Sequence, residues 1–241
     1  MKKLLVILII LFFKNFLFSQ EIIQAGVYEV KGDEAFNNEN YKEAILNYDN
    51  AINFRVDDFT YYLRGLSKFF LEDYQGAVID LSKSISIFSK ERDKSNKKGD
   101  KSDFWITGRY SKGINDSIEW AGIIQIEHKY SHAYYYRGIA KSILNDNMGA
   151  ISDLNKSILI NKNSQAYYYR GRAKQNLKKY QEAILDYNNA IKIDKGYKEA
   201  YFFRGLSKGN LKLTNEACLD LSKAGELGFS DAYEVIKDNC K

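Results

Sequence analysis

The stretch Ala133-Tyr-Tyr-Tyr-Arg-Gly-Ile-Ala-Lys141 is repeated along this chain of 241 residues. Close copies begin at Ala166 and at Ala200, and an earlier, more divergent copy occupies 60–68. A nearly constant period of about 34 residues indicates one supersecondary unit that is stacked several times. The sequence therefore predicts an array of repeats.

The residues around each copy follow a common order: an aromatic residue, a glycine, an alanine and then a second large side chain. This order resembles the tetratricopeptide repeat, a helical hairpin of about 34 residues, in a variant with arginine where that family prefers leucine. The resemblance covers about 25–240 and implies an all-α fold, a right-handed α-solenoid of helix hairpins. The glycine and alanine of the five units are Gly32 and Ala44, Gly65 and Ala77, Gly138 and Ala150, Gly171 and Ala183, and Gly205 and Ala217. These small residues let two antiparallel helices approach closely.

The repeat period divides the chain into five regions. We expect a signal peptide at 1–20, the first two units at 25–91, a charged insertion plus a decayed repeat at 92–130, three further units at 131–229, and a capping helix at 230–241. The insertion is needed because the distance along the chain from Gly65 to Gly138 slightly exceeds two repeat periods.

Within the insertion, the mixed charges of 90–103 predict a solvated loop, and 116–126 predicts the second helix of the decayed unit. The aromatic segment 104–110 has two interpretations. Phe104 and Trp105 either cover the gap between units or form a flap over the concave face that contacts a ligand.

The N-terminus has the plan of a secretory signal peptide, with a basic start, an unbroken apolar run at 4–13 and a small residue, Ser19, near its end. A bilayer span takes about 20 residues, so we expect cleavage after Ser19 or Gln20. A retained membrane anchor is the other interpretation, and it would place Lys14 in hydrocarbon. The expected location is therefore periplasmic or secreted, without stable membrane insertion after cleavage.

An arginine stands directly before the glycine in four units, and an aspartate follows it at a constant spacing, on the second helix. The pairs are Arg64 with Asp80, Arg137 with Asp153, Arg170 with Asp186, and Arg204 with Asp220. Each arginine has a lysine four residues on, and like charges at this spacing on a helix repel each other. We expect half-buried, structural salt bridges in which the aspartate compensates this repulsion.

The first helices of such an array line its concave wall. The side chains expected to face this groove are Tyr62, Leu66, Tyr135, Ile139, Tyr168, Arg172, Phe202 and Leu206. Aromatic residues with an occasional arginine suit peptide recognition, and packing between neighbouring helices is the other interpretation of these positions. The carboxylate-clamp grooves of the family carry lysine and asparagine on this wall, so the resemblance does not favour recognition of an acidic chain terminus.

Two cysteines, Cys218 and Cys240, stand near the C-terminus. We expect Gly228 to end one helix and a capping helix to follow at 231–239, capped by Ser230 or Asp231. The cysteines lie ten residues before and twelve residues after Gly228, hence nearly level in a hairpin. In an exported protein this favours a disulfide, with two unpaired thiols as the alternative. The sequence of residues 224–228 also resembles a Sel1-type repeat.

The sequence lacks the residues that several classes of function require. Without Lys2, Lys3 and Lys14 the 36 basic residues fall to 33 against 31 acidic ones, which gives no electrostatic case for nucleic acid. There is no Ser-His-Asp order, phosphate loop or Cys-x-x-Cys motif. His128 and His132, separated by an expected turn, have no third ligand for zinc.

The resemblance implies a non-catalytic scaffold that binds a peptide or protein in its groove, with no cofactor and no metal. The alternative is a cell-envelope binder of a glycan or small molecule, held in the Tyr-rich groove under a flap at Trp105. An accessory subunit of an envelope enzyme is a third possibility.

Overall fold

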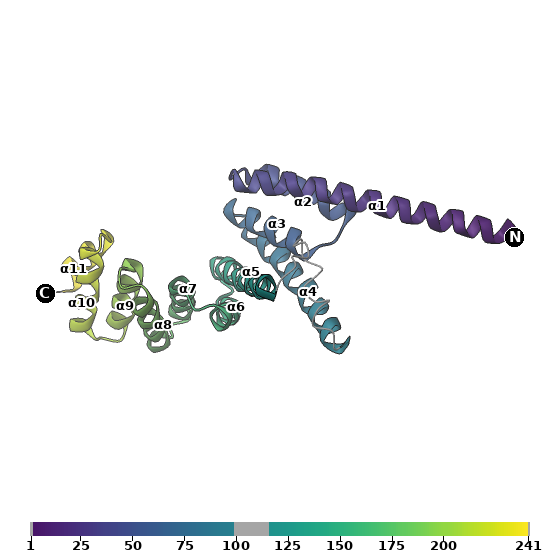
Figure 1. Ribbon diagram of the computed structural model, residues 1–241. Helices are drawn as coiled ribbons and strands as arrows, with labels where there is room; N and C mark the ends of the chain where they lie inside the picture. The colour runs from purple at the N-terminus through teal and green to yellow at the C-terminus, as the bar shows by residue number, and fades with distance from the viewer. Residues whose placement is uncertain (1, 99–115, 241) are drawn as a thin grey trace. The chain divides into compact units, whose positions relative to one another are not determined.

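The computed structural model describes residues 2–98 and 116–240, which form eleven helices and no strand (Figure 1). The predicted all-α fold is confirmed for these residues. The helices are α1 (Lys2–Asn37), α2 (Tyr41–Phe54), α3 (Asp58–Phe70), α4 (Tyr74–Lys98), α5 (Asp116–Ile143), α6 (Asn147–Ile160), α7 (Ser164–Asn176), α8 (Tyr180–Ile193), α9 (Lys198–Asn210), α10 (Thr214–Glu226) and α11 (Asp231–Asn239). They belong to two compact units, Met1–Glu119 and Trp120–Lys241, which we describe separately.

Consecutive helices pair as hairpins within each unit (Figure 1). The pairing depends on glycine in the first helix, as the repeat pattern predicts. A Cβ added at Gly171 would lie 2.7 Å from the ring of Tyr187, and one at Gly32 would lie 2.5 Å from that of Tyr48. The two helices are therefore close enough that only glycine leaves room for the large residue of the second helix.

The turn inside each repeat hairpin uses one residue with positive φ, and none of these residues is glycine. They are Glu39, Glu72, Asn145, Lys178 and Lys212, with φ between 58° and 65°. The next residue donates its backbone N–H to a carbonyl five residues earlier, for example Lys179 to Lys174 at 2.9 Å. This is the Schellman ending of a helix, here built without glycine. The last turn uses the expected glycine, Gly228, at φ 88°.

Two boundaries inside the insertion were predicted wrongly. The charged segment from Lys90 continues α4 as far as Lys98 instead of forming a loop. Lysine, glutamate and arginine are good helix formers, and no glycine or proline interrupts them before Gly99. The helix expected at 116–126 and the first helix of the next unit are one continuous helix, α5. No turn separates His128 from His132.

Residues 99–115, which include the predicted flap with Phe104 and Trp105, lie outside the described residues. Whether this segment covers a gap or contacts a ligand therefore stays a prediction.

The N-terminal helix α1 carries both the predicted signal segment and the first helix of the first repeat. Of the side chains described between Leu11 and Gln24, every one is exposed, and the first buried side chain is that of Ala25. Within the described residues, no helix combines the length and hydropathy that crossing a membrane requires. Cleavage after Ser19 or Gln20 remains a prediction.

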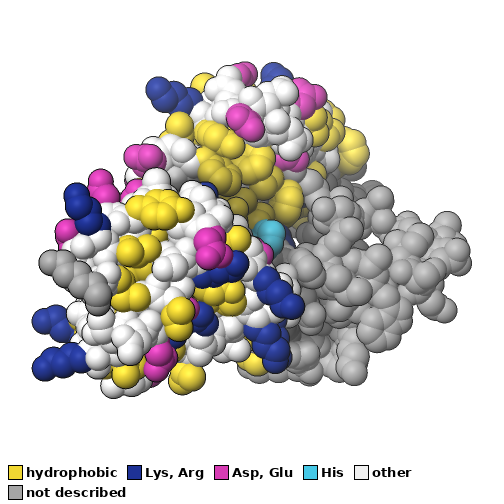
Figure 2. All heavy atoms as spheres, turned by 90° about the vertical axis from the view of Figure 1, so that its left-hand side faces the viewer, with side chains coloured by type: hydrophobic (Ala, Val, Ile, Leu, Met, Phe, Trp, Pro, Cys, Tyr) yellow, Lys and Arg dark blue, Asp and Glu magenta, His cyan; other side chains and the backbone are white. Residues whose placement is uncertain are grey.

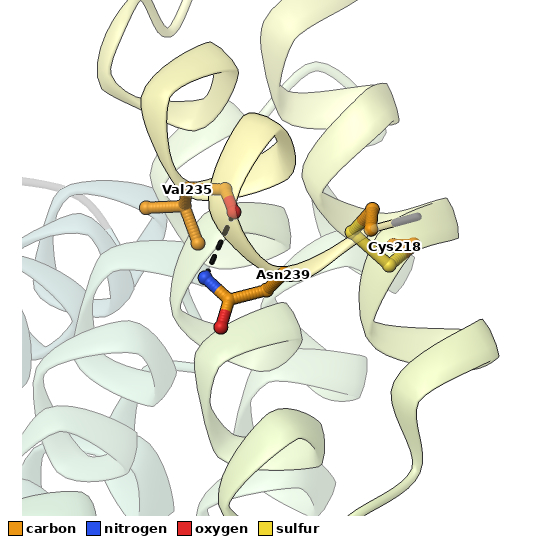
Figure 3. Close-up of a disulfide and its surroundings, with 4 residues drawn as sticks. Cys218, Val235 and Asn239 are labelled. Carbon is orange, nitrogen blue, oxygen red and sulfur yellow. Dashed lines mark hydrogen bonds between the residues drawn. A yellow bond between two sulfur atoms is a disulfide. The ribbon is translucent and has the colours of Figure 1, made fainter.

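The C-terminal helix α11 has the bounds that the sequence predicts and packs on α10. Phe229, just before α11, contacts Phe202 on α9 with tilted rings whose centroids are 4.5 Å apart, and Ala232 of α11 is fully buried. The predicted disulfide between Cys218 and Cys240 is present, with the two Cα atoms 5.8 Å apart (Figure 3). The end of α11 is thus tied covalently to α10.

Candidate functional site

The four predicted arginine–aspartate pairs are present in the structure, and each contains a third charge. In the third hairpin, Nε and Nη2 of Arg137 donate to the two carboxylate oxygens of Asp153 at 2.8 and 2.7 Å. Nζ of Lys141 lies 2.8 Å from the same carboxylate. Lys141, which we expected only to repel Arg137, is therefore a second partner of Asp153.

The same three-residue cluster recurs on the other three hairpins, which makes it a property of the repeat. The clusters are Arg64, Lys68 and Asp80; Arg137, Lys141 and Asp153; Arg170, Lys174 and Asp186; and Arg204, Lys208 and Asp220. We call these the Arg-Lys-Asp clusters. All four aspartates are buried, and a buried carboxylate needs such partners to stay charged.

The arginine also joins its hairpin to the preceding one. Nη1 of Arg170 donates to Asn155 on α6 at 2.7 Å, and Nη1 of Arg204 donates to Asn188 on α8, also at 2.7 Å. Arg64 does the same with Asp49 on α2. The arginine thereby connects the two helices of one repeat and the repeat before it.

A tyrosine three residues before each arginine supports it through its ring. The guanidinium carbons of Arg170 and Arg204 lie 5.3 and 5.2 Å from the ring centroids of Tyr167 and Tyr201. Cation–π contact of this kind partly replaces the lost hydration of a half-buried arginine. Each of these arginines is held by ion pairs, hydrogen bonds and a ring contact within the chain, which fits the structural role predicted from the sequence.

The first hairpin lacks this cluster and uses another buried acid. Glu29 on α1 accepts two hydrogen bonds from Arg55 at 2.9 and 3.0 Å and one from Thr60 at 3.0 Å. The sequence analysis missed this network because Arg55 follows α2 instead of lying in the repeated motif. Lys31 and Asn47 stand where the other hairpins have the arginine and the aspartate, so the first hairpin has no such pair.

Most of the side chains predicted to face a groove are buried in the core. Tyr62, Leu66, Ile139, Tyr168 and Phe202 each expose less than a tenth of their surface. Two of them lie in hydrophobic core clusters: Tyr168 packs with Tyr187 and Ile191 of α8, and Phe202 packs with Leu221 of α10. Tyr135, Arg172 and Leu206 remain half-buried and accessible.

The aromatic residues of successive first helices contact one another across the repeats of the second unit. Tyr135 on α5 meets Tyr169 on α7 with centroids 5.9 Å apart, and Tyr168 on α7 meets Phe203 on α9 at the same distance. The second aromatic of one repeat thus packs on the third aromatic of the next. Sequence reasoning used only the first two positions and overlooked the third.

Burial raises the pKa of four tyrosine hydroxyls in the second unit. It does so for Tyr135, Tyr187 and Tyr197, and for Tyr168, where the charge of Arg172 and its hydrogen bond oppose the effect. These phenols therefore stay protonated well beyond neutral pH and act as neutral hydrogen-bonding groups.

One side of α5, α7 and α9 keeps accessible side chains, and we call it the first-helix face. It carries the half-buried Tyr135, Arg172 and Leu206 and the exposed Gln165. Tyr135 donates to Gln165 at 3.3 Å, and Arg172 donates to Tyr168 at 3.0 Å. Apolar bodies with polar tips are suited to contact with a peptide.

Among the described side chains, no group of three His, Cys, Asp or Glu is placed to hold a metal ion. Figure 2 shows hydrophobic, basic and acidic side chains mixed over the face that it presents, without a broad area of one charge.

A sequence model described as "Tetratricopeptide repeat" matches residues 164–197, the hairpin formed by α7 and α8. A search of curated proteins found no match. The solved structures include many matches with similar folds.

Several of these structures cover most of the chain, and three of them are the following. A crystal structure of MamA protein is 20% identical, covers 87% of this chain and 94% of its own, and has a TM-score of 0.64. YrrB, described as "a TPR protein with an unusual peptide-binding site", is 17% identical, with coverage of 91% and 97% and a TM-score of 0.66. MamA 41-end from Desulfovibrio magneticus RS-1 is 16% identical, with coverage of 86% and 96% and a TM-score of 0.64.

At these identities the three structures establish the fold. The matched hairpin shows the same glycine, alanine and Arg-Lys-Asp positions as the hairpins around it. Residues 164–197 therefore form a tetratricopeptide repeat, and the described parts of the chain have the all-helical fold of the solved structures that it matches.

Proposed function

We propose that this protein is a non-catalytic scaffold that binds a peptide or protein segment outside the cytoplasm. The observation that carries the proposal is the first-helix face of the second unit, where Tyr135, Arg172 and Leu206 are half-buried on the first helices of three successive repeats. Side chains of this kind lose their remaining exposure on binding, and aromatic and arginine residues contribute most to such interfaces.

The distribution of charge supports binding rather than catalysis. The buried aspartates belong to the Arg-Lys-Asp clusters, and each accepts from both an arginine and a lysine, as Asp186 does from Arg170 and Lys174. A carboxylate held in this way has no free oxygen directed at a substrate. The face itself offers neutral hydroxyls, one amide and one guanidinium, which recognise a ligand without transforming it.

Two features support the proposed location outside the cytoplasm. The N-terminal segment has the plan of a signal peptide, and Cys218 and Cys240 form a disulfide, a bond that persists in oxidising compartments. The partner in this proposal is therefore an exported protein or the exported part of one.

Crosslinking in intact cells that produce the protein, followed by capture and mass spectrometry, tests the proposal. The variant Gln165→Arg places a large cation beside Tyr135 on the first-helix face, and Leu185→Arg is its matched control on the exposed side of α8, where Leu185 is 62% exposed. Both positions lie on the surface, so both variants should fold.

We expect a defined protein that crosslinks to the wild type and to Leu185→Arg and is lost from Gln165→Arg. A partner that Gln165→Arg retains would contradict the assignment of this face. If no protein is captured and the mature chain instead stays on cell-wall material, the scaffold function is wrong and the glycan-binding alternative is favoured.

A further inference from the structure

Arg172 differs from every other arginine whose side chain the structure describes. Arg55, Arg64, Arg137, Arg170 and Arg204 each contact at least one carboxylate. Arg172 contacts none among the described residues. Its only hydrogen bond there runs from Nη1 to the hydroxyl of Tyr168 at 3.0 Å.

The repeat itself does not require an arginine at this position. The equivalent residues of three other repeats are Leu66, Ile139 and Leu206. Arg172 is half-buried among aromatic rings, and a guanidinium loses hydration in such a place without gaining a counter-charge. Its guanidinium carbon lies 3.8 Å from the ring centroid of Phe203, so cation–π contact compensates part of this cost.

These two contacts also determine how the guanidinium is oriented. The ring of Phe203 supports it, and the bond to Tyr168 fixes one Nη. Four of its five N–H donors have no partner among the described residues. A guanidinium held in one plane with free donors is arranged for the two oxygens of a carboxylate.

A neighbouring acid offers a competing explanation within the chain. The charge of Glu199, in the first turn of α9, acts on the hydroxyl of Tyr168, so this carboxylate is close to the same group. No ion pair joins Glu199 to Arg172 among the described residues. The test must therefore separate binding of an external carboxylate from pairing with Glu199.

We propose that Arg172, held by Phe203 and Tyr168, binds a carboxylate of the partner peptide. The carboxylate belongs either to an aspartate or glutamate side chain or to the end of the chain. This inference rests on the proposed function and specifies the chemistry of the partner at one point of the first-helix face.

The first experiment uses the mature protein with ¹⁵N labelling and follows the Nε–H signal of Arg172 during titration with short peptides. Acetyl-Leu-Glu-Leu-amide presents a side-chain carboxylate, acetyl-Leu-Leu-Leu presents only a terminal one, and acetyl-Leu-Gln-Leu-amide presents neither. Arg172→Leu is the matched variant because leucine occupies this position in two other repeats, and Glu199→Gln removes the internal competitor.

We expect a carboxylate peptide to shift the Arg172 signal and to bind at least about tenfold more tightly than the glutamine peptide. Arg172→Leu should lose that difference, and Glu199→Gln should keep or increase it. The peptide that binds better identifies the source of the carboxylate. Equal affinity for the glutamate and glutamine peptides, an unchanged preference in Arg172→Leu, or no shift up to about 10 mM of either carboxylate peptide would overturn the inference.

The capture experiment separates this inference from the proposed function. If Arg172→Leu retains the partner that Gln165→Arg loses, the scaffold function stands and the carboxylate site is wrong. If the wild type captures no protein at all, the scaffold function fails, and the peptide titration still decides whether Arg172 binds a carboxylate. Thermal unfolding of Arg172→Leu, followed by circular dichroism, checks that the variant is folded.

Discussion

At Asp153 three charges meet in a nearly buried place, and their arrangement explains why the repeat tolerates arginine where leucine is usual. Arg137 and Lys141 lie four residues apart on α5, and both reach the carboxylate, which belongs to α6. The repulsion between the two cations is therefore offset by one shared anion, and the aspartate has donors for both oxygens.

Asp153→Ala should lower the free energy of unfolding by up to about 3–5 kcal/mol, because it leaves two cations half-buried without an anion. We expect a loss below the top of this range, because Arg137 and Lys141 keep 12% and 21% of their side-chain surface exposed to water. Urea unfolding followed by circular dichroism measures the change. Asp238→Ala, at an exposed position of α11, is the control and should change stability by less than about 0.5 kcal/mol. Equal stability of the two variants would show that the cluster contributes nothing.

Lys174→Met should cost less than removal of the aspartate. Methionine keeps the apolar stem of the side chain, and Arg170 still binds both oxygens of Asp186. We expect a loss of about 1.5–3 kcal/mol, the usual value of one hydrogen bond to a charged group. The same urea series measures it beside Asp186→Ala. A loss as large as that of Asp186→Ala would mean that lysine, not arginine, holds the aspartate.

The Arg-Lys-Asp clusters and Tyr168 show what could and could not be predicted from the sequence. The constant spacing of arginine and aspartate predicted their pairing because both positions recur with every copy of the motif. The sequence analysis treated Lys141 only as a repelling charge. Lys141 lies about one helical turn from Arg137, however, and within reach of Asp153. The spacing could not decide between the groove and the core for Tyr168, because that depends on how closely the next repeat packs.

At the scale of the element, glycine determines how closely the two helices of a hairpin approach. Gly171→Ala would place a methyl group 2.7 Å from the ring of Tyr187, whose hydroxyl also donates to Gln175 at 2.7 Å. We expect a loss of about 1–3 kcal/mol from this overpacking. Gly209 on α9 is the matched control, because nothing lies within 4 Å of an added Cβ.

Gly209→Ala should leave stability unchanged or raise it by up to about 1 kcal/mol, since alanine favours the helix. Thermal and urea unfolding of the two glycine variants, side by side, check the contrast. A stable Gly171→Ala protein would mean that the ring of Tyr187 moves easily, and that glycine is not needed for the close approach.

The ends of helices were predicted correctly where a glycine marks them and wrongly where glycine and proline are missing. Gly228 marked the end of α10, and the bounds of α11 followed from it. No glycine or proline stands between Gly122 and Gly138, and α5 runs through this region without a break. The expected turn there came from the repeat period alone, which gives the spacing of units but not the ends of helices.

The disulfide is the covalent part of the capping element. Replacing Cys218 and Cys240 with alanine should lower the free energy of unfolding by about 3 kcal/mol, because the bond closes a loop of 22 residues in the unfolded chain. Hydrogen exchange should show faster exchange in α11 with little change in α7. Protection of α11 that survives the substitution would show that non-covalent packing, such as the contact of Phe229 with Phe202, holds the cap by itself.

At the scale of the whole molecule, each of the two units is built from contacts between neighbouring hairpins. The period in the sequence predicted this organisation because each repeat carries the same close-packing and charged positions. It could not predict which surface remains accessible, since only the packed array shows that Tyr135 and Arg172 stay half-exposed while Tyr62 and Phe202 are covered.

The segment before the first repeat gives the last prediction. None of the side chains described from Leu11 to Gln24 is buried, and buried contacts begin at Ala25. Cleavage after Ser19 or Gln20 therefore removes exposed apolar surface without removing any described core contact. We expect the intact mass of the exported protein to correspond to a chain that begins at Gln20 or Glu21. Leu8→Arg, which puts a charge into the apolar run, should block export. A mature mass that still includes Met1 would favour a retained anchor and would contradict the signal peptide.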